Sequence, residues 1–570
     1  MRSSKQPRLR KQARLDIMMI VSVISGLFWC FGLSELDLDG RSLGVARIML
    51  GALVLVDLLT SRWPLRYLIY SDGPLSMWPR QVVREGGGDP QIQVNDFSIY
   101  MISGSIRWTS FCFIMSGIAS IMFTLGIFTQ ISCAICWVHV KSLSARSSAV
   151  QQAGDTLFRI LLFWFIWLPC SKHYSLDAEF FGPVRAGGTS LNTVASTAYM
   201  IQVALLYQVP AAFKINRLWS SPTREESAIY YVLANVAFRR TNILTNWLLR
   251  HPELTSALTV VTPFLEHAAP IFIFGGRIPG LRLVGVALLV GFHWGLHVCM
   301  TLRLFPWICI AAWVALLPSA FWEWCLPLSE IKSVPQESGI ATWLYDCFSL
   351  VVCVLALFSA LQSCLDSLPL PEALAQSISA THGWHMLSRI GRLLGMHQQW
   401  FLFDNPAKTS YWFRIKGIPK SRSDSGRGSA EGVEIEYDLH KLLRYHCSGD
   451  GSYASLSPKL LADKLVLDSR INEEEDFEEV YGGALWRKFF QNLGQLCNEK
   501  TRPRYAAFVP HYVKALHSLW NQRGLHKQLG DLQEVKCVAS WRDTSPIGNV
   551  SKAVVNCQVM WIVDTFVKDE

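Results

Sequence analysis

Apolar runs separated by short polar loops fill roughly the first 365 residues of this chain. Such runs, nearly free of charge, are typical of helices that cross a bilayer, which takes about 20 residues. The first, "IMMIVSVISGLFWCFGL", follows a basic start. The further candidate spans cover roughly residues 44–60, 110–128, 130–142, 155–170, 195–213, 256–275, 279–298, 299–318 and 341–363. The pattern predicts a polytopic, all-α membrane bundle of about eight to ten spans, since several runs are short.

The pattern changes after about residue 365, where apolar runs shorten and charge rises. Period-two alternation in "GVEIEY" and "KAVVNCQVMWIVD" predicts strands, and the spacing in "RYAAFVPHYVKALHSLWNQR" predicts a helix between them. We therefore expect four parts: a basic amino terminus with the first span (1–42), the main transmembrane region (43–325), an additional span (326–365) and a smaller soluble α+β domain (366–570).

Composition supports a membrane protein. Of the 570 residues, 51% are hydrophobic and only 17% are charged, which is too apolar for an ordinary soluble protein. The net charge of +9 comes from basic residues spread through loops and the amino terminus, so no nucleic-acid partner is expected. The basic "MRSSKQPRLRKQAR" precedes a run with no small-residue cleavage site after it, which favours an uncleaved span with a cytoplasmic amino terminus over a signal peptide.

Most of the 15 cysteines lie in or beside apolar runs, where a free thiol behaves as a small hydrophobe. Cys133 and Cys136, in "CAIC", are interpreted as helix packing because no second pair lies at a zinc-like spacing. The tail cysteines either pair or stay free, depending on the compartment. They are Cys447, Cys497, Cys537 and Cys557.

Ionisable residues at membrane depth are functional candidates, because an unpaired charge there is costly. They are Lys214, Glu266, His267, His293, His297, Asp177 and His173. His293 and His297 share one face of a helix and have the spacing of two zinc ligands, but without a third partner no metal is expected. The alternative for the two histidines is hydrogen bonding across the bundle, and for Asp177 it is a place in an interface loop.

Lys214 ends a long apolar run in "YQVPAAFKINRLW" and has two interpretations. Its ammonium can snorkel to the headgroups at a helix end. Alternatively, a lysine desolvated among apolar and aromatic groups can lose its charge and act as a base towards a weak acid such as a quinol hydroxyl, with a nearby imidazole or carboxylate to hold the proton.

Six parts of the chain, in order, resemble the horizontally transferred transmembrane (HTTM) domain that is shared with the vitamin K-dependent gamma-carboxylases. They cover roughly residues 43 to 325. They are "GVARIMLGALVLVDL" with "YSDGPLSMWPR", then "TLGIFTQISCAICW", "AGDTLFRILLFWFIWLPCSKHYSLDA", "YQVPAAFKINRLW", "PELTSALTVVTPFLE" and "FHWGLHVCMTLRLFPW".

The resemblance implies quinol chemistry. A lysine placed like Lys214, five residues before a tryptophan, is thought to deprotonate vitamin K hydroquinone in the carboxylases; O2 then gives the epoxide and a stronger base, which takes a γ-proton from a peptide glutamate before CO2 adds. It implies Lys214 as base, with His293 and Asp177 as further catalytic residues. His173, Glu266 and His297 are candidates for the pocket. The implied cofactor is a reduced vitamin K-type quinone, without a metal, and the partners are the bilayer, a membrane quinol and a secreted peptide.

The chain also departs from the carboxylases. Alignment on Ser175 and Asp177 places Lys172 opposite the family histidine and shifts His173 by one position. The tail has no recognisable propeptide-binding region. Instead, "GMHQQWFLFDNPAKTSYWFRIKG" resembles the segment after the membrane domain in bacterial HTTM proteins, which implies a multi-pass protein of a bacterial inner membrane. A non-catalytic role in maturation or export of a secreted peptide is the alternative. A transporter is a weaker third, because internal symmetry is not evident.

Overall fold

The computed structural model describes most of the membrane region and part of the tail. The described residues are 37–73, 97–147, 150–180, 190–191, 193–235, 238–275, 280–325, 340–368, 381–406, 408–419, 436–439, 441–442, 457–465, 508–543 and 556–564. The first predicted span, residues 17–33, lies outside them.

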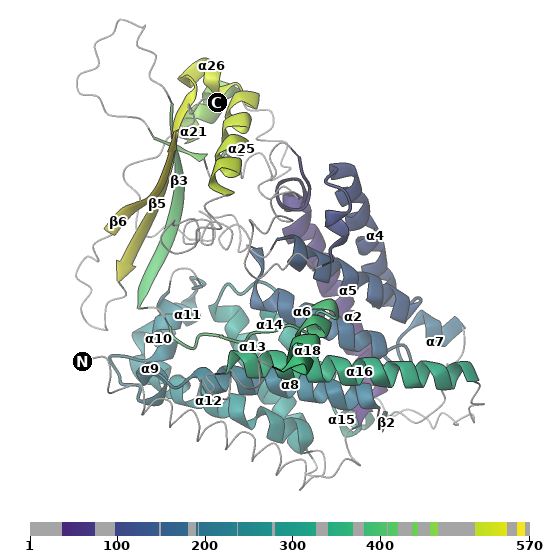
Figure 1. The fold of residues 1–570 in the computed structure, drawn as a ribbon. Helices are drawn as coiled ribbons and strands as arrows, with labels where there is room; N and C mark the ends of the chain where they lie inside the picture. Colours follow the sequence, from purple (N-terminus) through teal and green to yellow (C-terminus); the bar gives the residue numbers. More distant parts are fainter. Residues whose placement is uncertain are drawn as a thin grey trace, which may run out of the picture.

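The described part of the membrane region is a bundle of helices, with the tail at one end (Figure 1). Its longer helices are α2 (Gly40–Val56), α4 (Ile106–Leu125), α5 (Thr129–Arg146), α6 (Ala153–Trp167), α8 (Val194–Phe213), α12 (Pro252–Phe274), α13 (Leu281–Cys299), α14 (Phe305–Val314) and α16 (Ile340–Ser367). Shorter helices connect them: α7 (Leu176–Phe180), α9 (Arg217–Ser220), α10 (Ala228–Ala234), α11 (Ile243–Arg250) and α15 (Ser319–Cys325). Each predicted span within the described residues corresponds to a helix, which confirms a mainly helical bundle.

Five helices of the described part are long and apolar enough to cross a membrane. They are Gly40–Tyr70, Ile106–Leu125, Pro252–Phe274, Leu281–Cys299 and Asp346–Ser367. A sixth arises if α14 and α15, bent by 86°, form one broken span. By length and composition this is a multi-pass membrane protein. The number is below the predicted eight to ten, partly because helices such as α6, with 15 residues, are too short to qualify.

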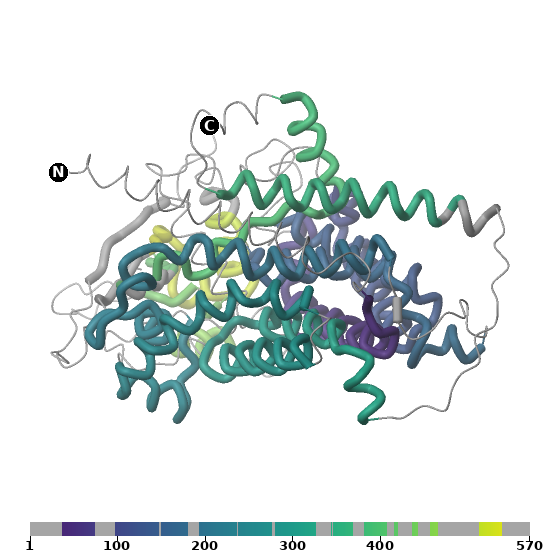
Figure 2. Tube along the Cα trace, turned by 90° about the horizontal axis from the view of Figure 1, so that it is seen from below, coloured from purple at the N-terminus to yellow at the C-terminus, as the bar shows by residue number. Residues whose placement is uncertain are grey.

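Helix α6 lies at the centre of the bundle. Every residue from Gly154 to Phe165 is buried, and the helix contacts α5, α8 and α14. Trp164 of α6 and Trp313 of α14 are fully buried. Both cysteines of "CAIC" are also buried, and Cys133 Sγ donates to the carbonyl of Leu162 at 3.3 Å, so the pair packs α5 against α6. In the view of Figure 2, α16 lies along one edge of the bundle.

The tail contains an antiparallel sheet of order β4-β3-β5-β6. The strands are β3 (Thr409–Pro419), β4 (Tyr437–Asp438), β5 (Leu532–Asp543) and β6 (Asn556–Asp564), accompanied by α21 (Pro458–Leu465), α25 (Phe508–Gln522) and α26 (Leu525–Leu529). Strand β6 and helix α25 confirm the pattern of "KAVVNCQVMWIVD" and "RYAAFVPHYVKALHSLWNQR". Only the end of "GVEIEY" falls in the described residues, where Tyr437 belongs to β4.

Candidate functional site

The residue that ends the apolar run, Lys214, points into the protein. It lies directly after α8, and its side chain is only 3% exposed. Lys214 Nζ donates to Glu266 Oε1 at 2.9 Å and to Oε2 at 2.7 Å, and it lies 5.3 Å from the ring centroid of Trp219. The ammonium is therefore held between a carboxylate and an aromatic face inside the bundle, which excludes snorkelling in this structure.

A proline one turn further along α12 helps to place Glu266. Pro270 has no N–H to donate, so the Glu266 carbonyl, four residues earlier, loses its helical partner. Gln208 of α8 supplies one instead: its Nε2 donates to Glu266 O at 3.3 Å and to His267 O at 2.9 Å. His267 Nδ1 lies 3.3 Å from Gln208 Oε1. The backbone carbonyls of α12 at this break in its hydrogen bonding are thus bonded to α8, beside the ion pair.

A second group of polar side chains lies two helical turns before Lys214. Tyr207 is seven residues earlier, on the same face of α8. Its hydroxyl accepts a hydrogen bond from Trp313 Nε1 at 2.7 Å and lies 2.7 Å from His293 Nε2. With the indole N–H accepted, the phenol hydrogen can be donated to Nε2, which leaves the proton of a neutral His293 on Nδ1. That Nδ1 is buried and has no hydrogen-bond partner in the described part of the chain.

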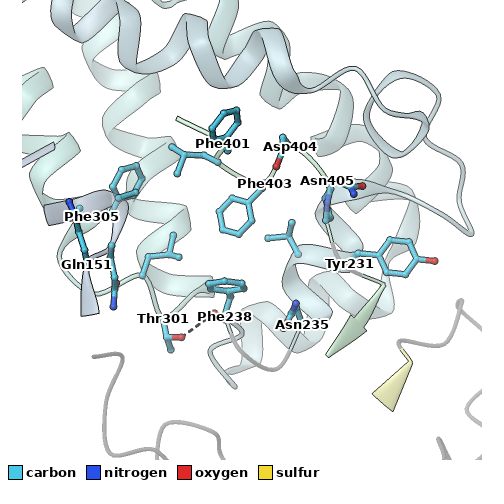
Figure 3. Close-up of a pocket in the computed structure, with 17 residues that line it drawn as sticks. Gln151, Tyr231, Asn235, Phe238, Thr301, Phe305, Phe401, Phe403, Asp404 and Asn405 are labelled. Atoms are coloured by element: carbon cyan, nitrogen blue, oxygen red, sulfur yellow. Dashed lines mark hydrogen bonds between the residues drawn. The ribbon is translucent and has the colours of Figure 1, made fainter. Parts of the chain in front are cut away.

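A cavity of about 430 Å³ lies close to these groups (Figure 3). Its walls come from the start of α6, from α10 and the segment after it, from the turn before α14, and from residues 401–406. The aromatic rings are Phe238, Phe305, Phe401, Phe403 and Tyr231; the polar lining is Gln151, Gln152, Asn235, Thr301, Asp404 and Asn405. A mainly apolar lining with a few polar groups is the usual character of a site for a small organic ligand.

Residues beside the ion pair contact residues that line the cavity. Phe213, next to Lys214, packs against Phe401 with ring centroids 4.8 Å apart and ring planes inclined by 59°. Trp219 Nε1 donates to the carbonyl of Phe403 at 2.9 Å. His293 contacts the ring of Phe305, a lining residue, with centroids 6.0 Å apart. Neither Lys214 nor His293 lines the cavity itself: His293 contacts the lining residue Phe305, and Lys214 is linked to the wall through Phe213 and Trp219.

The segment before residue 401 is inserted into the bundle. Gln398 is 1% exposed and exchanges amide hydrogen bonds with Gln202 of α8, at 2.8 and 3.2 Å. Trp400 is fully buried and its Nε1 donates to Gln398 Oε1 at 2.7 Å. Arg159 of α6 donates to the carbonyl of Gly395 at 2.8 Å. The stretch "GMHQQW" thus anchors the cavity wall that follows it, and strand β3 begins three residues after Pro406, the last lining residue.

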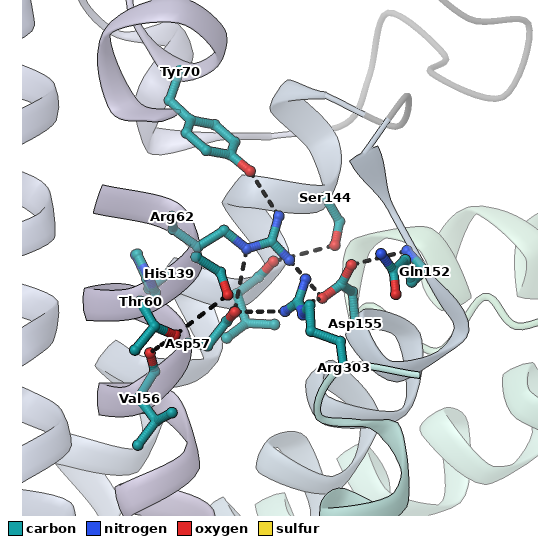
Figure 4. Close-up of polar contacts among 12 residues, drawn as sticks. Val56, Asp57, Thr60, Arg62, Tyr70, His139, Ser144, Gln152, Asp155 and Arg303 are labelled. Atoms are coloured by element: carbon teal, nitrogen blue, oxygen red, sulfur yellow. Dashed lines mark hydrogen bonds and ion pairs between the residues drawn. The ribbon is translucent and has the colours of Figure 1, made fainter. Parts of the chain in front are cut away.

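A buried ion network lies behind two walls of the cavity (Figure 4). Arg62 donates to Asp155 Oδ1 at 2.5 Å, to Asp57 Oδ2 at 3.2 Å and to the Tyr70 hydroxyl at 2.7 Å. Arg303 donates to Asp57 Oδ1 at 2.5 Å and to Asp155 Oδ1 at 3.0 Å. Two arginines and two aspartates balance in charge, which is the condition for burying them.

Each end of the network fixes part of the cavity. Asp155 accepts from the backbone N–H of Gln152 and completes a capping box at the start of α6. Arg303 adopts a left-handed backbone, with φ of 53°, between the lining residues Leu302 and Phe305. Sequence reasoning missed this network. The available signal was Asp57 inside a predicted span.

Asp177 and His173 make their contacts elsewhere. Asp177 Oδ1 accepts from the backbone N–H of Phe128, and Oδ2 accepts from the N–H and hydroxyl of Thr129, at 2.7 to 2.8 Å. This carboxylate therefore caps the start of α5. The His173 carbonyl lies close to Gly44 of α2, and burial lowers the pKa of its imidazole, against the opposing charge of Asp39.

The remaining histidine, His297, faces two tryptophans. Its ring centroid lies 4.9 Å from that of Trp307 and 5.9 Å from that of Trp294. His293, one turn away, hydrogen-bonds to Tyr207 instead, so the two histidines do not share a ligand-binding site. Within the described ranges, no three His, Cys, Asp or Glu side chains gather where they could hold a metal ion.

The structure thus pairs Lys214 with Glu266 where α8 meets α12, and pairs His293 with Tyr207, two turns earlier on α8; Asp177, His173 and His297 make their contacts elsewhere. Tyr207, Gln208 and Trp313 belong to the site and were not predicted; the available signal was Gln208, a polar residue inside an apolar run. Comparison of the chain with protein-family models, curated proteins and solved structures gave no match.

Proposed function

We propose that this chain is a multi-pass enzyme of a bacterial inner membrane that takes a proton from a membrane quinol at the Lys214–Glu266 pair and lets O2 react with the quinol anion. The observation that carries the proposal is a lysine–carboxylate pair buried in a helical bundle and linked to the wall of an aromatic cavity through Phe213 and Trp219. An aromatic ring of quinol size suits such a lining, and His293 Nδ1, which has no partner among the described residues, offers a donor behind the lining residue Phe305.

The ion pair can act as a base as it stands. An ammonium with a carboxylate has no net charge and can accept one proton, which gives an ammonium with a neutral acid. The positive charge that results balances the quinol anion in the cavity, so no net charge is created in a low-dielectric site. Lys214 would stabilise the anion from behind the cavity wall, and Glu266 would store the proton.

The overall reaction balances without a metal. A quinol and O2 give the quinone epoxide and water: one oxygen atom enters the ring, and the other leaves with the two quinol hydrogens. The resemblance to the gamma-carboxylases further implies that the base formed with the epoxide takes a γ-proton from a peptide glutamate, to which CO2 adds.

The test is epoxide formation from a reduced naphthoquinone by the purified full-length protein in detergent. We expect Lys214→Ala and Glu266→Gln each to lose most of the activity. The swap Lys214→Glu with Glu266→Lys is the informative control, because it restores an ion pair but moves the amine to α12. Loss of activity in a folded swap variant would support a chemical role for Lys214.

Two results would contradict the proposal. Full activity in the swap variant would make the pair structural. No epoxide from the wild type, across several quinols, would favour the non-catalytic role in maturation or export of a secreted peptide.

A further inference from the structure

Helix α18 (His382–Leu393), which the proposed reaction does not use, carries three stripes of different chemistry. One stripe faces α16: Trp384 Nε1 donates to Asp366 Oδ1 at 2.7 Å, and Gly391 lies close to Ser359. The helix is therefore fixed against the helix Asp346–Ser367, which is long and apolar enough to span a membrane, and in Figure 2 it rises above α16.

The second stripe is apolar and exposed. Met386 and Leu393, seven residues apart, share one line along the helix and are 51% and 64% exposed. Ile390 lies beside them and is half-buried. Large apolar side chains of this kind on a helix next to a membrane span need an apolar environment.

The third stripe is basic and borders the apolar one. His382, His385, Arg389 and Arg392 are spaced by three, four and three residues, which places them on one line. The sequence of α18, "HGWHMLSRIGRL", contains no acidic residue. An apolar face flanked by basic side chains is the pattern of a helix that lies in a membrane surface.

We propose that α18 is an interfacial helix that binds anionic phospholipids, with Met386 and Leu393 in the acyl region and Arg389 and Arg392 on the phosphates. The contact of Trp384 with Asp366, one residue before the end of the span, supports a lipid occupant, because the end of a span lies at the level of the headgroups. The charge of the basic stripe complements the negative lipid surface. The site is independent of the quinol chemistry.

The first experiment measures thermal unfolding of the full-length protein in nanodiscs of phosphatidylcholine, alone or mixed with phosphatidylglycerol. We expect the anionic lipid to raise Tm by several degrees, less so at high salt. The double variant Arg389→Gln, Arg392→Gln should lose most of this shift. A matched control, Lys459→Gln with Lys464→Gln, removes two exposed lysines of α21 and should keep it. An equal shift in both double variants would overturn the proposal.

The second experiment does not depend on the arginine variants folding. A photo-crosslinking amino acid, benzoylphenylalanine, replaces Leu393 in the full-length protein, and products are identified by mass spectrometry. Attachment to phospholipid acyl chains, with none from the same label at Lys459, supports the proposal. Crosslinks from Leu393 to a second copy or to another protein, without lipid, would overturn it.

Discussion

Lys214 and Glu266, 52 residues apart, form a two-pronged ion pair between the end of α8 and the middle of α12. Their side chains are 3% and 10% exposed, so each charge depends on the other for its stabilisation. The stability of the protein should therefore depend on this ion pair, whether or not the pair takes part in a reaction.

Removing one partner should destabilise the protein far more than removing both. Lys214→Met leaves the Glu266 carboxylate buried and unpaired, and we expect a loss of about 3–5 kcal/mol in the free energy of unfolding. The double variant Lys214→Met, Glu266→Leu replaces both charges by apolar groups and should recover most of that loss. Unfolding in mixed micelles of increasing denaturing detergent measures both. A double variant no more stable than the single one would show that the pair is not buried as described.

Gly126, whose carbonyl accepts from the N–H of Asp177 at 2.8 Å in the turn after α4, and Gly117, inside α4, form a matched pair for backbone effects. Gly126 has φ of 72°, and a Cβ there would lie 1.7 Å from Arg47 Nη1 and 2.4 Å from Ser175 Cβ. We expect Gly126→Ala to cost more than about 2 kcal/mol. Among the described residues, none outside the backbone of α4 lies within 4 Å of a Cβ added at Gly117, so Gly117→Ala should stabilise the helix by about 0.5–1 kcal/mol.

The two glycine variants are compared by their melting temperatures in one detergent. Shifts of the same sign would contradict the packing of Arg47 against this turn.

Asp177 should behave as a helix cap. Asp177→Ala removes the acceptor for the first N–H groups of α5 and should cost about 1 kcal/mol, whereas Asp177→Asn keeps an amide oxygen and should cost less. Hydrogen exchange of the Phe128 and Thr129 amides should accelerate in the alanine variant. If Asp177→Asn abolished epoxide formation without this local change, the catalytic role that the resemblance implies would be restored.

The helices could be predicted because apolar runs map directly onto buried or lipid-facing helices: residues 195–213 were expected, and α8 covers Val194–Phe213. The break in the chain before α14 could not be predicted from the sequence. The run 299–318 was expected as one span, but residues 301–304 leave the helix, with Arg303 held by Asp57 and Asp155 from two distant elements.

The same limit applies to the candidate site. The position of Lys214 at the end of an apolar run was visible in the sequence, and both it and Glu266 were recognised as candidates. Their pairing was not predicted, because the two residues come from separate helices and the packing of those helices is a tertiary property. Tyr207 was missed since a tyrosine in an apolar run has no local signal that distinguishes it from ordinary core packing.

The tail should lose stability in acid through Glu436. Burial opposes ionisation of the Glu436 carboxyl. Hydrogen bonds from Lys416 of β3 and Lys536 of β5 outweigh this effect and lower the pKa of Glu436. A pKa that is lower in the folded than in the unfolded state means that the unfolded chain binds the proton more tightly. The stabilisation is therefore complete above the ordinary glutamate value of about 4.3 and is lost as pH falls through the lowered folded value.

Glu436→Gln tests this directly. The variant should be less stable than the wild type at neutral pH, and the difference should shrink as pH falls below about 4. Hydrogen exchange of β3 and β5 amides, compared at two pH values after correction for intrinsic rates, reports on this sheet without unfolding the bundle. A parallel pH dependence in the wild type and the variant would mean that the lysines of β3 and β5 do not hold this carboxylate.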